Sequence, residues 1–310
     1  GIKVEMVGRI DNDQYIISDI NSINVVDNSI KLENNKVGNE KVLTVLVNFD
    51  DNPIEVLNIS DVENTMFNNP NSVRAYFLEA SYGKLDLSGN VIGYFTQPRS
   101  LLNCNNMFPL YYSIINQIDP YVYFPDYQYI VFSINEGCLP NIGIPNMQFI
   151  TQDGVVRVGL AVMRPESMYL NSIGHELGHA MRLSHARAYE CGSGIAYGSC
   201  SLIEYGDPYD MMASYNHFHF NSIEKEFLGW FNNNQVIEVT ESGIYEIEAL
   251  SISSSNPKVL KIPKRYNYNT CELFEWYFVE YRLPIGFDNE SRNYLENYNV
   301  TNGAWIHYSP

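Results

Sequence analysis

The sequence lacks any hydrophobic run long enough to span a membrane. Of its 310 residues, 45% are hydrophobic and 18% charged, and no apolar stretch reaches the ~20 residues that a bilayer requires. Disorder of the whole chain is also excluded, because aromatic residues make up 14% of it and supply too much apolar surface for an unfolded protein. We therefore expect a folded protein without a membrane span.

Basic residues are scarce as well. Nineteen Lys and Arg side chains stand against 36 Asp and Glu, which gives a formal net charge of −17. This field repels phosphate backbones, and no Lys/Arg cluster offsets it locally, so nucleic acid is not an expected partner. Calcium sites stay open in so acidic a chain, but no motif indicates them. Asp11, Asn12 and Asp13 lack the glycine and the distal glutamate of an EF-hand loop.

No two of the five cysteines have CxxC spacing, which excludes a cysteine-rich zinc site. Cys191 and Cys200 bracket a Gly/Ser-rich loop that a disulfide could close, and Cys104 with Cys138 is a second candidate pair. Five reduced thiols are equally compatible with the sequence. The pairing of these four cysteines and Cys271 therefore stays open.

Hydrophobic patterning predicts strands and helices in alternation up to residue 183. The β-branched run 41–49 is typical of a strand buried on both faces. Apolar residues at three- to four-residue spacing predict a helix over 72–81, which Gly83 ends. We further predict a hairpin of strands 85–87 and 91–95, helices over 107–118 and 165–183, and strands over 127–134 and 155–163, the last bent at Gly159.

Beyond Trp230 the pattern changes to short strands, predicted over 235–240, 243–247, 258–262, 276–281 and 304–308. We expect an α+β chain in three parts. Residues 1–40 are a strand-rich segment that a pro-segment would explain, 41–233 form the main domain, and 234–310 form a β-rich C-terminal module. The chain stops just after a strand, so we expect a longer natural protein.

One short segment carries the strongest chemical signal: His175-Glu176-Leu177-Gly178-His179. Histidines at positions i and i+4 of a helix lie on one face and can bind the same metal ion. Glu176 is rotated about 100° around the helix axis, where it can act as a general base without being a ligand. His185 follows six residues after His179. Three imidazoles with an open fourth position are typical of one catalytic Zn²⁺ ion.

This segment resembles the metzincin zinc-peptidase motif, in which three histidines are spaced as His175, His179 and His185. Metzincins also have a downstream Met-turn, and 207–213 is similar to one. Alignment with that motif selects Met212 as the turn methionine, with Met211 as the alternative. The stretches 81–85, 183–186, 205–210, 225–230 and, less closely, 279–282 resemble the gametolysin-like branch.

The resemblance implies a secreted zinc-dependent endopeptidase that hydrolyses internal peptide bonds of protein or peptide substrates. It implies a zincin-like catalytic domain, with a mixed sheet and an active-site helix, ahead of the β-rich module. In such enzymes the substrate pairs with an edge strand above the cleft, and the resemblance suggests 155–163 for it. The natural substrate and the oligomeric state stay open.

Arg182 departs from the family motif, which has glycine at that position. There the helix ends in a left-handed or similarly tight conformation, which costs a non-glycine residue roughly 1–2 kcal/mol. Metal binding can absorb this strain, so we retain His185 as a ligand. The departure also leaves an alternative open, in which the chain is a catalytically inactive binding or adhesion module on a zincin fold.

Three further residues near the Met-turn have side chains that can line or bind a metal site. Tyr215 lies three residues after Met212, whereas a tyrosine ligand in metzincins lies two after, so we interpret it as a pocket-wall or core residue. His217 and His219 are interpreted as surface histidines, with a role in a substrate pocket as the alternative. A latent form, in which residues 1–40 cover the cleft, stays open as well. A cysteine latch from that segment is excluded, because its residues include no cysteine.

Overall fold

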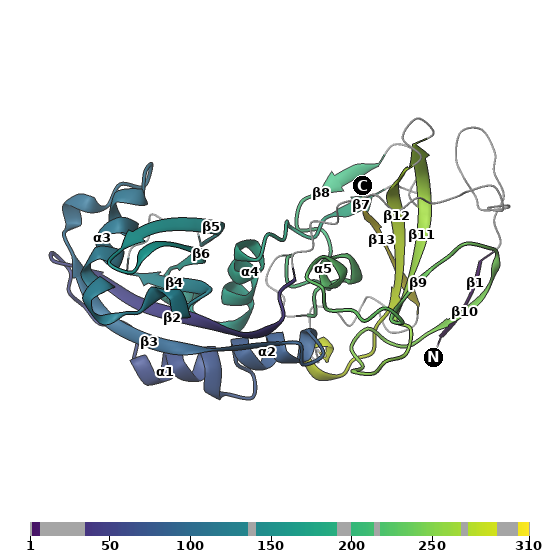
Figure 1. The fold of residues 1–310 in the computed structure, drawn as a ribbon, viewed down its shortest axis with the longest axis horizontal. Coiled ribbons are helices and arrows are strands. Elements are labelled where there is room, and N and C mark those ends of the chain that lie inside the picture. Colours follow the sequence, from purple (N-terminus) through teal and green to yellow (C-terminus); the bar gives the residue numbers. More distant parts are fainter. Residues whose placement is uncertain are drawn as a thin grey trace. The chain divides into compact units, whose positions relative to one another are not determined.

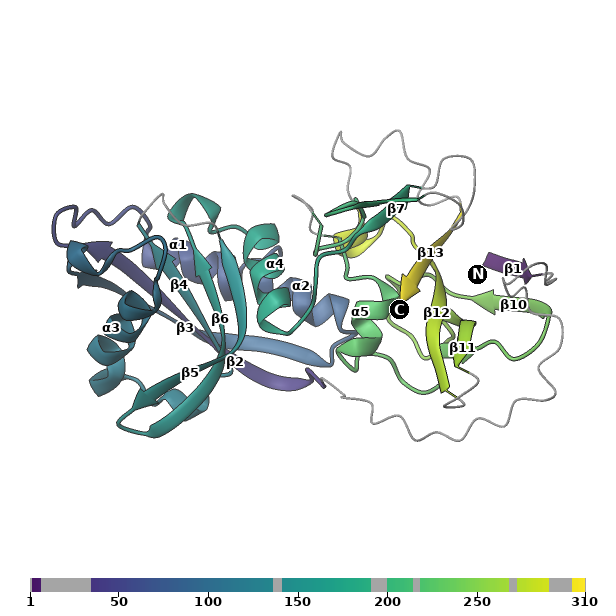
Figure 2. The same ribbon diagram turned by 90° about the horizontal axis from the view of Figure 1, so that it is seen from above.

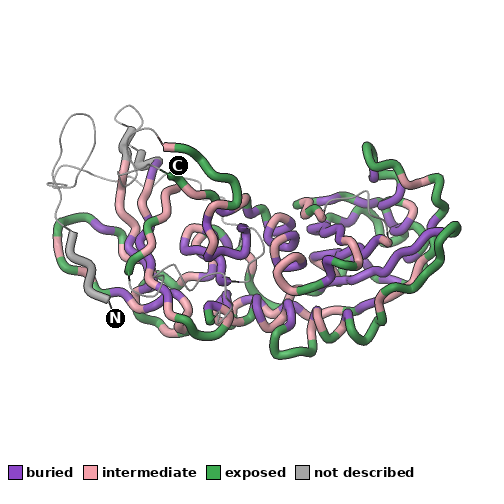
Figure 3. Tube along the Cα trace, turned by 180° about the vertical axis from the view of Figure 1, so that it is seen from behind, coloured by how far each residue is buried: buried purple, intermediate pink, exposed green. Residues whose placement is uncertain are grey.

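The computed structural model describes residues 2–6, 35–135, 141–190, 200–213, 218–267, 272–289 and 303–309. The chain divides into two compact units, which we call the site unit (residues 37–217) and the C-terminal unit (residues 1–36 and 218–310). Both contain helices and strands, so the α+β class is confirmed in this general form. Figure 3 shows that each unit contains buried residues.

A five-stranded mixed sheet forms the centre of the site unit (Figure 1). Its order is β3 (Leu85–Gln97), β2 (Gly38–Phe49), β4 (Tyr129–Ile134), β6 (Gly154–Met163) and β5 (Ile142–Thr151). The first four strands are parallel, and β5 is antiparallel to β6. The predicted strands over 41–49, 127–134 and 155–163 are therefore all present.

Helices cover both faces of this sheet. Helix α3 (Phe108–Ile118) packs on one face, and α2 (Val73–Ala80) with α4 (Leu170–Ala180) lies on the other (Figure 2). Gly159 of β6 lies close to α4 on the second face, because an added Cβ there would lie 3.0 Å from the Cβ of Ala180. Burial on both faces explains the continuous apolar run of β2, since neither face meets water.

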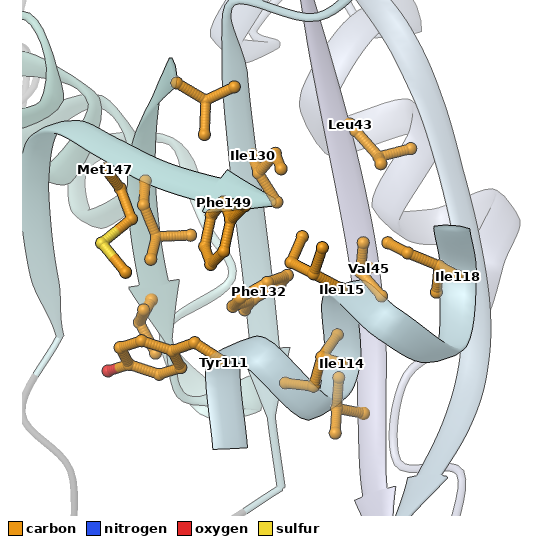
Figure 4. Close-up of a cluster of buried hydrophobic side chains, with 14 of the residues drawn as sticks. Leu43, Val45, Tyr111, Ile114, Ile115, Ile118, Ile130, Phe132, Met147 and Phe149 are labelled. Carbon is orange, nitrogen blue, oxygen red and sulfur yellow. The ribbon is translucent and has the colours of Figure 1, made fainter. Parts of the chain in front are cut away.

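The main hydrophobic core lies between α3 and the sheet. Figure 4 shows α3 side chains facing β2 and β4, with Met147 and Phe149 of β5 closing the cluster. Residues at three- to four-residue spacing along α3 point into it, as a helix period requires. The α3 residues that are buried are Leu110, Tyr111, Ile114, Ile115 and Ile118.

The predicted hairpin over 85–95 is wrong. Residues 85–97 form one continuous strand, β3, which pairs in parallel with β2 along its length. Gly89 does not form a turn. A Cβ at this position would lie 1.8 Å from the carbonyl oxygen of Val42, so glycine is required by close approach to the neighbouring strand.

Two predictions about the second half of the site unit also need correction. Strand β6 is not an edge strand, because β4 and β5 flank it, and β5 forms the edge of the sheet instead. The helix predicted over 165–183 begins later, since Pro165–Ser167 forms a separate 3-10 turn ahead of α4. Strand β5 is not predicted by the sequence pattern, because its exposed and buried residues alternate irregularly around a bulge.

The remaining elements of the site unit are short. They are α1 (Ile59–Glu63), a π-helix (Asn64–Asn68), 3-10 turns (Arg99–Leu101, Asp119–Tyr121, Phe124–Asp126), and the paired strands β7 (Ala188–Glu190) and β8 (Ser201–Ile203). Among described residues no helix is long and apolar enough to cross a membrane. Cys104 and Cys200 each take part in a disulfide bond. The alternative of five reduced thiols is therefore wrong. Cys138, Cys191 and Cys271 lie outside the described residues.

The C-terminal unit contains a four-stranded sheet with the order β13 (Ala304–Ser309), β12 (Glu272–Tyr281), β11 (Val259–Asn267) and β9 (Val236–Glu238). The predicted strand over 243–247 is β10 (Gly243–Ile247), which pairs with β1 (Ile2–Met6) from the start of the chain. Helix α5 (Ser222–Phe227) and a 3-10 turn (Gly286–Asp288) complete the unit.

A buried ionic cluster joins the loop before α5 to β12. The carboxylate of Glu280 accepts hydrogen bonds from Arg282 Nε (2.7 Å) and from the backbone N–H of Ser222 (2.7 Å). Arg282 also donates to the carbonyl of His219 (3.0 Å), whose N–H donates to Asp288 (2.9 Å). His219 is fully buried here, so its interpretation as a surface histidine is wrong.

Burial alone would raise the pKa of Glu280, but the charges of Arg282 and His307 and its hydrogen bonds lower the pKa below its ordinary value. The folded pKa is thus lower than the unfolded one, which is about 4.3. Glu280 therefore stabilises the fold fully above that pH, and the contribution is lost as pH falls through the folded pKa.

Replacing Glu280 with Gln tests this cluster. We expect a loss of about 3 kcal/mol in unfolding free energy at neutral pH, because the buried Arg282 loses its ion pair with Glu280 at 2.7 Å and keeps the longer one with Asp288 at 3.4 Å. The difference from the unchanged protein should shrink below about pH 4. Urea unfolding followed by tryptophan fluorescence at both pH values measures it. The exposed Glu246→Gln is the matched control, and an equal loss at both pH values would contradict the prediction.

Candidate metal centre

Helix α4 carries two of the predicted ligands, His175 and His179, on one face. The opposite face buries Ile173, Leu177 and Ala180, and this apolar stripe fixes the rotation of the helix. Both imidazoles are partly buried, and their ring centroids lie 4.7 Å apart. The i, i+4 spacing therefore brings the two rings together as predicted.

The helix ends in a Schellman motif that turns the chain toward the third histidine. Arg182 has a φ of +77°, and the N–H of Leu183 donates to the carbonyl of Gly178 (2.9 Å). The N–H of Arg182 donates to the carbonyl of His179 (2.8 Å), which completes the motif. The left-handed conformation expected at Arg182 is thus present, although the residue is not glycine.

His185 lies just beyond this turn and completes a cluster of three imidazoles. Its ring centroid is 4.7 Å from that of His179 and 5.3 Å from that of His175. One ring nitrogen from each histidine lies within 4.8 Å of the other two. Among the described residues this is the one group of three potential metal ligands.

Hydrogen bonds determine which ring nitrogen of His175 and of His179 is free to bind a metal. The Nδ1 of His175 lies 3.0 Å from the carbonyl oxygen of Met211, and the Nδ1 of His179 lies 2.8 Å from that of Leu183. A carbonyl can only accept, so each Nδ1 carries the proton and each Nε2 has a free lone pair. This tautomer is the one that binds a metal through Nε2.

Burial keeps the two helix imidazoles neutral. It lowers the pKa of His175 to about 4 and also lowers the pKa of His179, against the opposing effect of their carbonyl partners. Neutral imidazole is the form that coordinates a metal, because a protonated ring has no free lone pair. Both histidines are therefore ready to bind a cation at neutral pH.

Glu176 is buried beside the cluster, with 7% of its surface exposed. Burial raises the pKa of its carboxyl to about 7, and a hydrogen bond from the backbone N–H of Gly143 acts in the opposite direction. Gly143 belongs to β5, and a Cβ there would lie 2.1 Å from the carbonyl oxygen of Glu176. The edge strand thus crosses directly over the helix and helps to hold this side chain.

The segment that resembles a Met-turn lies against the same helix. The side chain of Met211 packs on Gly174, where an added Cβ would lie 2.9 Å from its Cε. Met212, the residue selected by alignment, is also fully buried, and its carbonyl accepts from the N–H of Ala186 (3.0 Å). Asp210 holds the turn by accepting from the N–H of Met212 (2.6 Å).

Two neighbours of His185 were missed by the sequence analysis. The carboxylate of Glu204 lies 2.6 Å from its Nδ1, and the ring of Tyr205 lies 3.9 Å from the His185 ring between centroids. Both follow β8 and reach the site only because β8 pairs with β7, so no local spacing pointed to them. Tyr215 and His217 lie outside the described residues.

Comparison with known proteins adds no family to this description. No family model matches the chain, and no curated protein matches it in sequence. The motif and the geometry of the three imidazoles are therefore the features that indicate a function.

Replacing Arg182 with Gly tests the strain at the end of α4. We expect an increase of about 1 kcal/mol in unfolding free energy, or ~2–4 °C in Tm, because glycine adopts positive φ without a steric penalty. Thermal unfolding of the metal-free protein measures this. The matched control is Arg164→Gly at φ −82°, which should lower Tm. A lower Tm for Arg182→Gly would contradict the prediction.

Proposed function

We propose that this chain is a secreted zinc-dependent endopeptidase of the metzincin type, which hydrolyses internal peptide bonds in protein substrates. The observation that carries the proposal is the cluster of three imidazoles next to a buried carboxyl group. The proposal includes a zincin-like catalytic domain, with α4 as its active-site helix. His175, His179 and His185 hold the metal, and Glu176 is the catalytic carboxylate.

The donor set fits zinc. Imidazole nitrogen is a ligand that zinc favours, and three protein ligands with one open position are typical of its catalytic sites. The hydrogen bonds at Nδ1 orient the rings and supply the outer partners that metal-binding histidines usually have. When bound, zinc acts as a Lewis acid, which makes water a stronger acid and a carbonyl a better electrophile.

Glu176 moves the proton in the proposed reaction. Its carboxylate accepts the proton that the attacking water loses as the new C–O bond forms, and returns it to the amine nitrogen as the C–N bond breaks. The hydrogen bond from Gly143 fixes its orientation. A carboxyl whose pKa lies near neutrality can both take and release a proton, and the positive charge of a bound metal ion would favour the ionised form.

Strand β5 is the element best placed to orient a peptide. It forms an edge of the sheet, and its first residues cross over the helix at Glu176. An extended peptide can pair with such an edge through main-chain hydrogen bonds. In the proposal β5 therefore has the substrate-binding role that the sequence analysis gave to 155–163.

The disulfide bonds at Cys104 and Cys200 support the secreted location in this proposal. Disulfides form and persist in oxidising compartments, and they are rare in the reducing cytosol.

Replacing Glu176 with Gln tests the proposed function. We expect cleavage of a denatured protein substrate to fall by a factor of roughly 10²–10⁴, because the general base is removed. Zinc content should stay near one ion per chain, since the three ligands are unchanged. The measurements are a gel-based cleavage assay and metal analysis of the same samples.

Glu166→Gln is the matched control for this experiment, because Glu166 is an exposed carboxylate on the turn before α4. It should leave both cleavage and zinc content unchanged. Undiminished cleavage by the Glu176 variant would refute the proposed mechanism. Zinc binding without any cleavage by the unchanged protein would instead favour the non-catalytic binding module.

A further inference from the structure

We infer that Glu204 is a positioning residue of the proposed metal centre, which fixes the tautomer and orientation of His185. The inference depends on the proposed function, since it concerns a ligand of that same site. It starts from a difference between the three histidines. His175 and His179 are held by a helix and by backbone carbonyls, whereas the Nδ1 of His185 is held by a side chain.

His185 needs such support because it lies outside regular structure. It follows the Schellman turn and precedes β7, and 22% of its side chain is exposed. Helix geometry therefore does not set the direction of its ring. The carboxylate oxygen Oε1 of Glu204, at 2.6 Å from Nδ1, is the partner that does.

The hairpin of β7 and β8 brings Glu204 to this position. Ala188 pairs with Ile203, so the residues that follow and precede these strands, Glu204 and Arg187, meet at the open end. Arg187 holds both carboxylate oxygens, with Nε 2.6 Å from Oε2 and Nη2 3.3 Å from Oε1. These two hydrogen bonds from Arg187 fix the orientation of the Glu204 carboxylate independently of His185.

Stability alone does not account for this arrangement. The side chains of Arg187 and Glu204 are 49% and 44% exposed, and ion pairs at such positions contribute little to folding. Tyr205 is held next to them with a φ of +57°, which is unfavourable for a non-glycine residue. Its ring lies against that of His185, tilted by 38° to it. Glu204 of the exposed ion pair and the strained residue Tyr205 therefore both contact the ring of His185.

The chemistry follows from what a carboxylate can do. An ionised carboxylate only accepts hydrogen bonds, so Nδ1 of His185 carries the proton and Nε2 keeps its lone pair. Arg187 donates to both oxygens of this carboxylate. Without Glu204 the ring could rotate and take either tautomer. Outer partners of this kind typically change metal affinity 10- to 100-fold.

The test compares Glu204→Ala and Glu204→Gln with the unchanged protein. Zinc affinity is measured by competition with a chromogenic chelator, and the His185 tautomer by ¹⁵N NMR of the metal-free protein at about pH 8.5, above the ordinary histidine pKa. We expect Glu204→Ala to weaken zinc binding roughly 10- to 100-fold and to lose the Nδ1–H tautomer. Glu204→Gln, which keeps an acceptor oxygen, should have a smaller effect on both.

Glu190→Gln is the matched control, because Glu190 is exposed on β7 of the same hairpin. It should bind zinc as the unchanged protein does. If the unchanged protein binds zinc and Glu204→Ala binds it equally well with the same tautomer, this inference is overturned and the proposed function stands. If the unchanged protein binds no zinc, the proposed function fails and this inference fails with it.

Discussion

The candidate site depends on one constraint, namely that the Nδ1 atom of each of three imidazoles is occupied by an acceptor. Two acceptors are backbone carbonyls and the third is the carboxylate of Glu204. Because none of them can donate, each neutral ring carries its proton on Nδ1 and its lone pair on Nε2, and the rings lie close enough to share one ion. The helix, its Schellman end and the β7–β8 hairpin each contribute one part of this arrangement.

Several residues around the site lower the stability of the fold through poor helix propensity or positive φ. The same residues allow the side chains of the site to reach their positions. Gly174 and Gly178 weaken α4 as a helix, yet Gly174 provides the space that Met211 fills. Arg182 and Tyr205 have positive φ values, and each stands where the chain must turn toward His185. Strain of this kind is common at functional sites, where the surrounding fold over-determines the backbone.

The sequence predicted what local periodicity encodes. The buried strand β2, the helices α2 and α3, and the pairing of His175 with His179 all follow from residue spacing. Contacts between distant segments were not accessible in this way. Gly89 was interpreted as a turn residue from its local sequence. Its close approach to Val42 results from strand pairing, which residue spacing does not reveal. Glu204 and the edge position of β5 likewise depend on which strands become neighbours, which no local pattern specifies.

The most direct test is anomalous X-ray diffraction above the zinc absorption edge, on crystals of the protein grown with zinc. The account predicts one strong anomalous peak, about 2.0–2.1 Å from the Nε2 atoms of His175, His179 and His185. It also predicts that Glu176 lies beside the ion without coordinating it. The absence of a peak at this position, or a His185 ring turned away from the peak, would contradict the account.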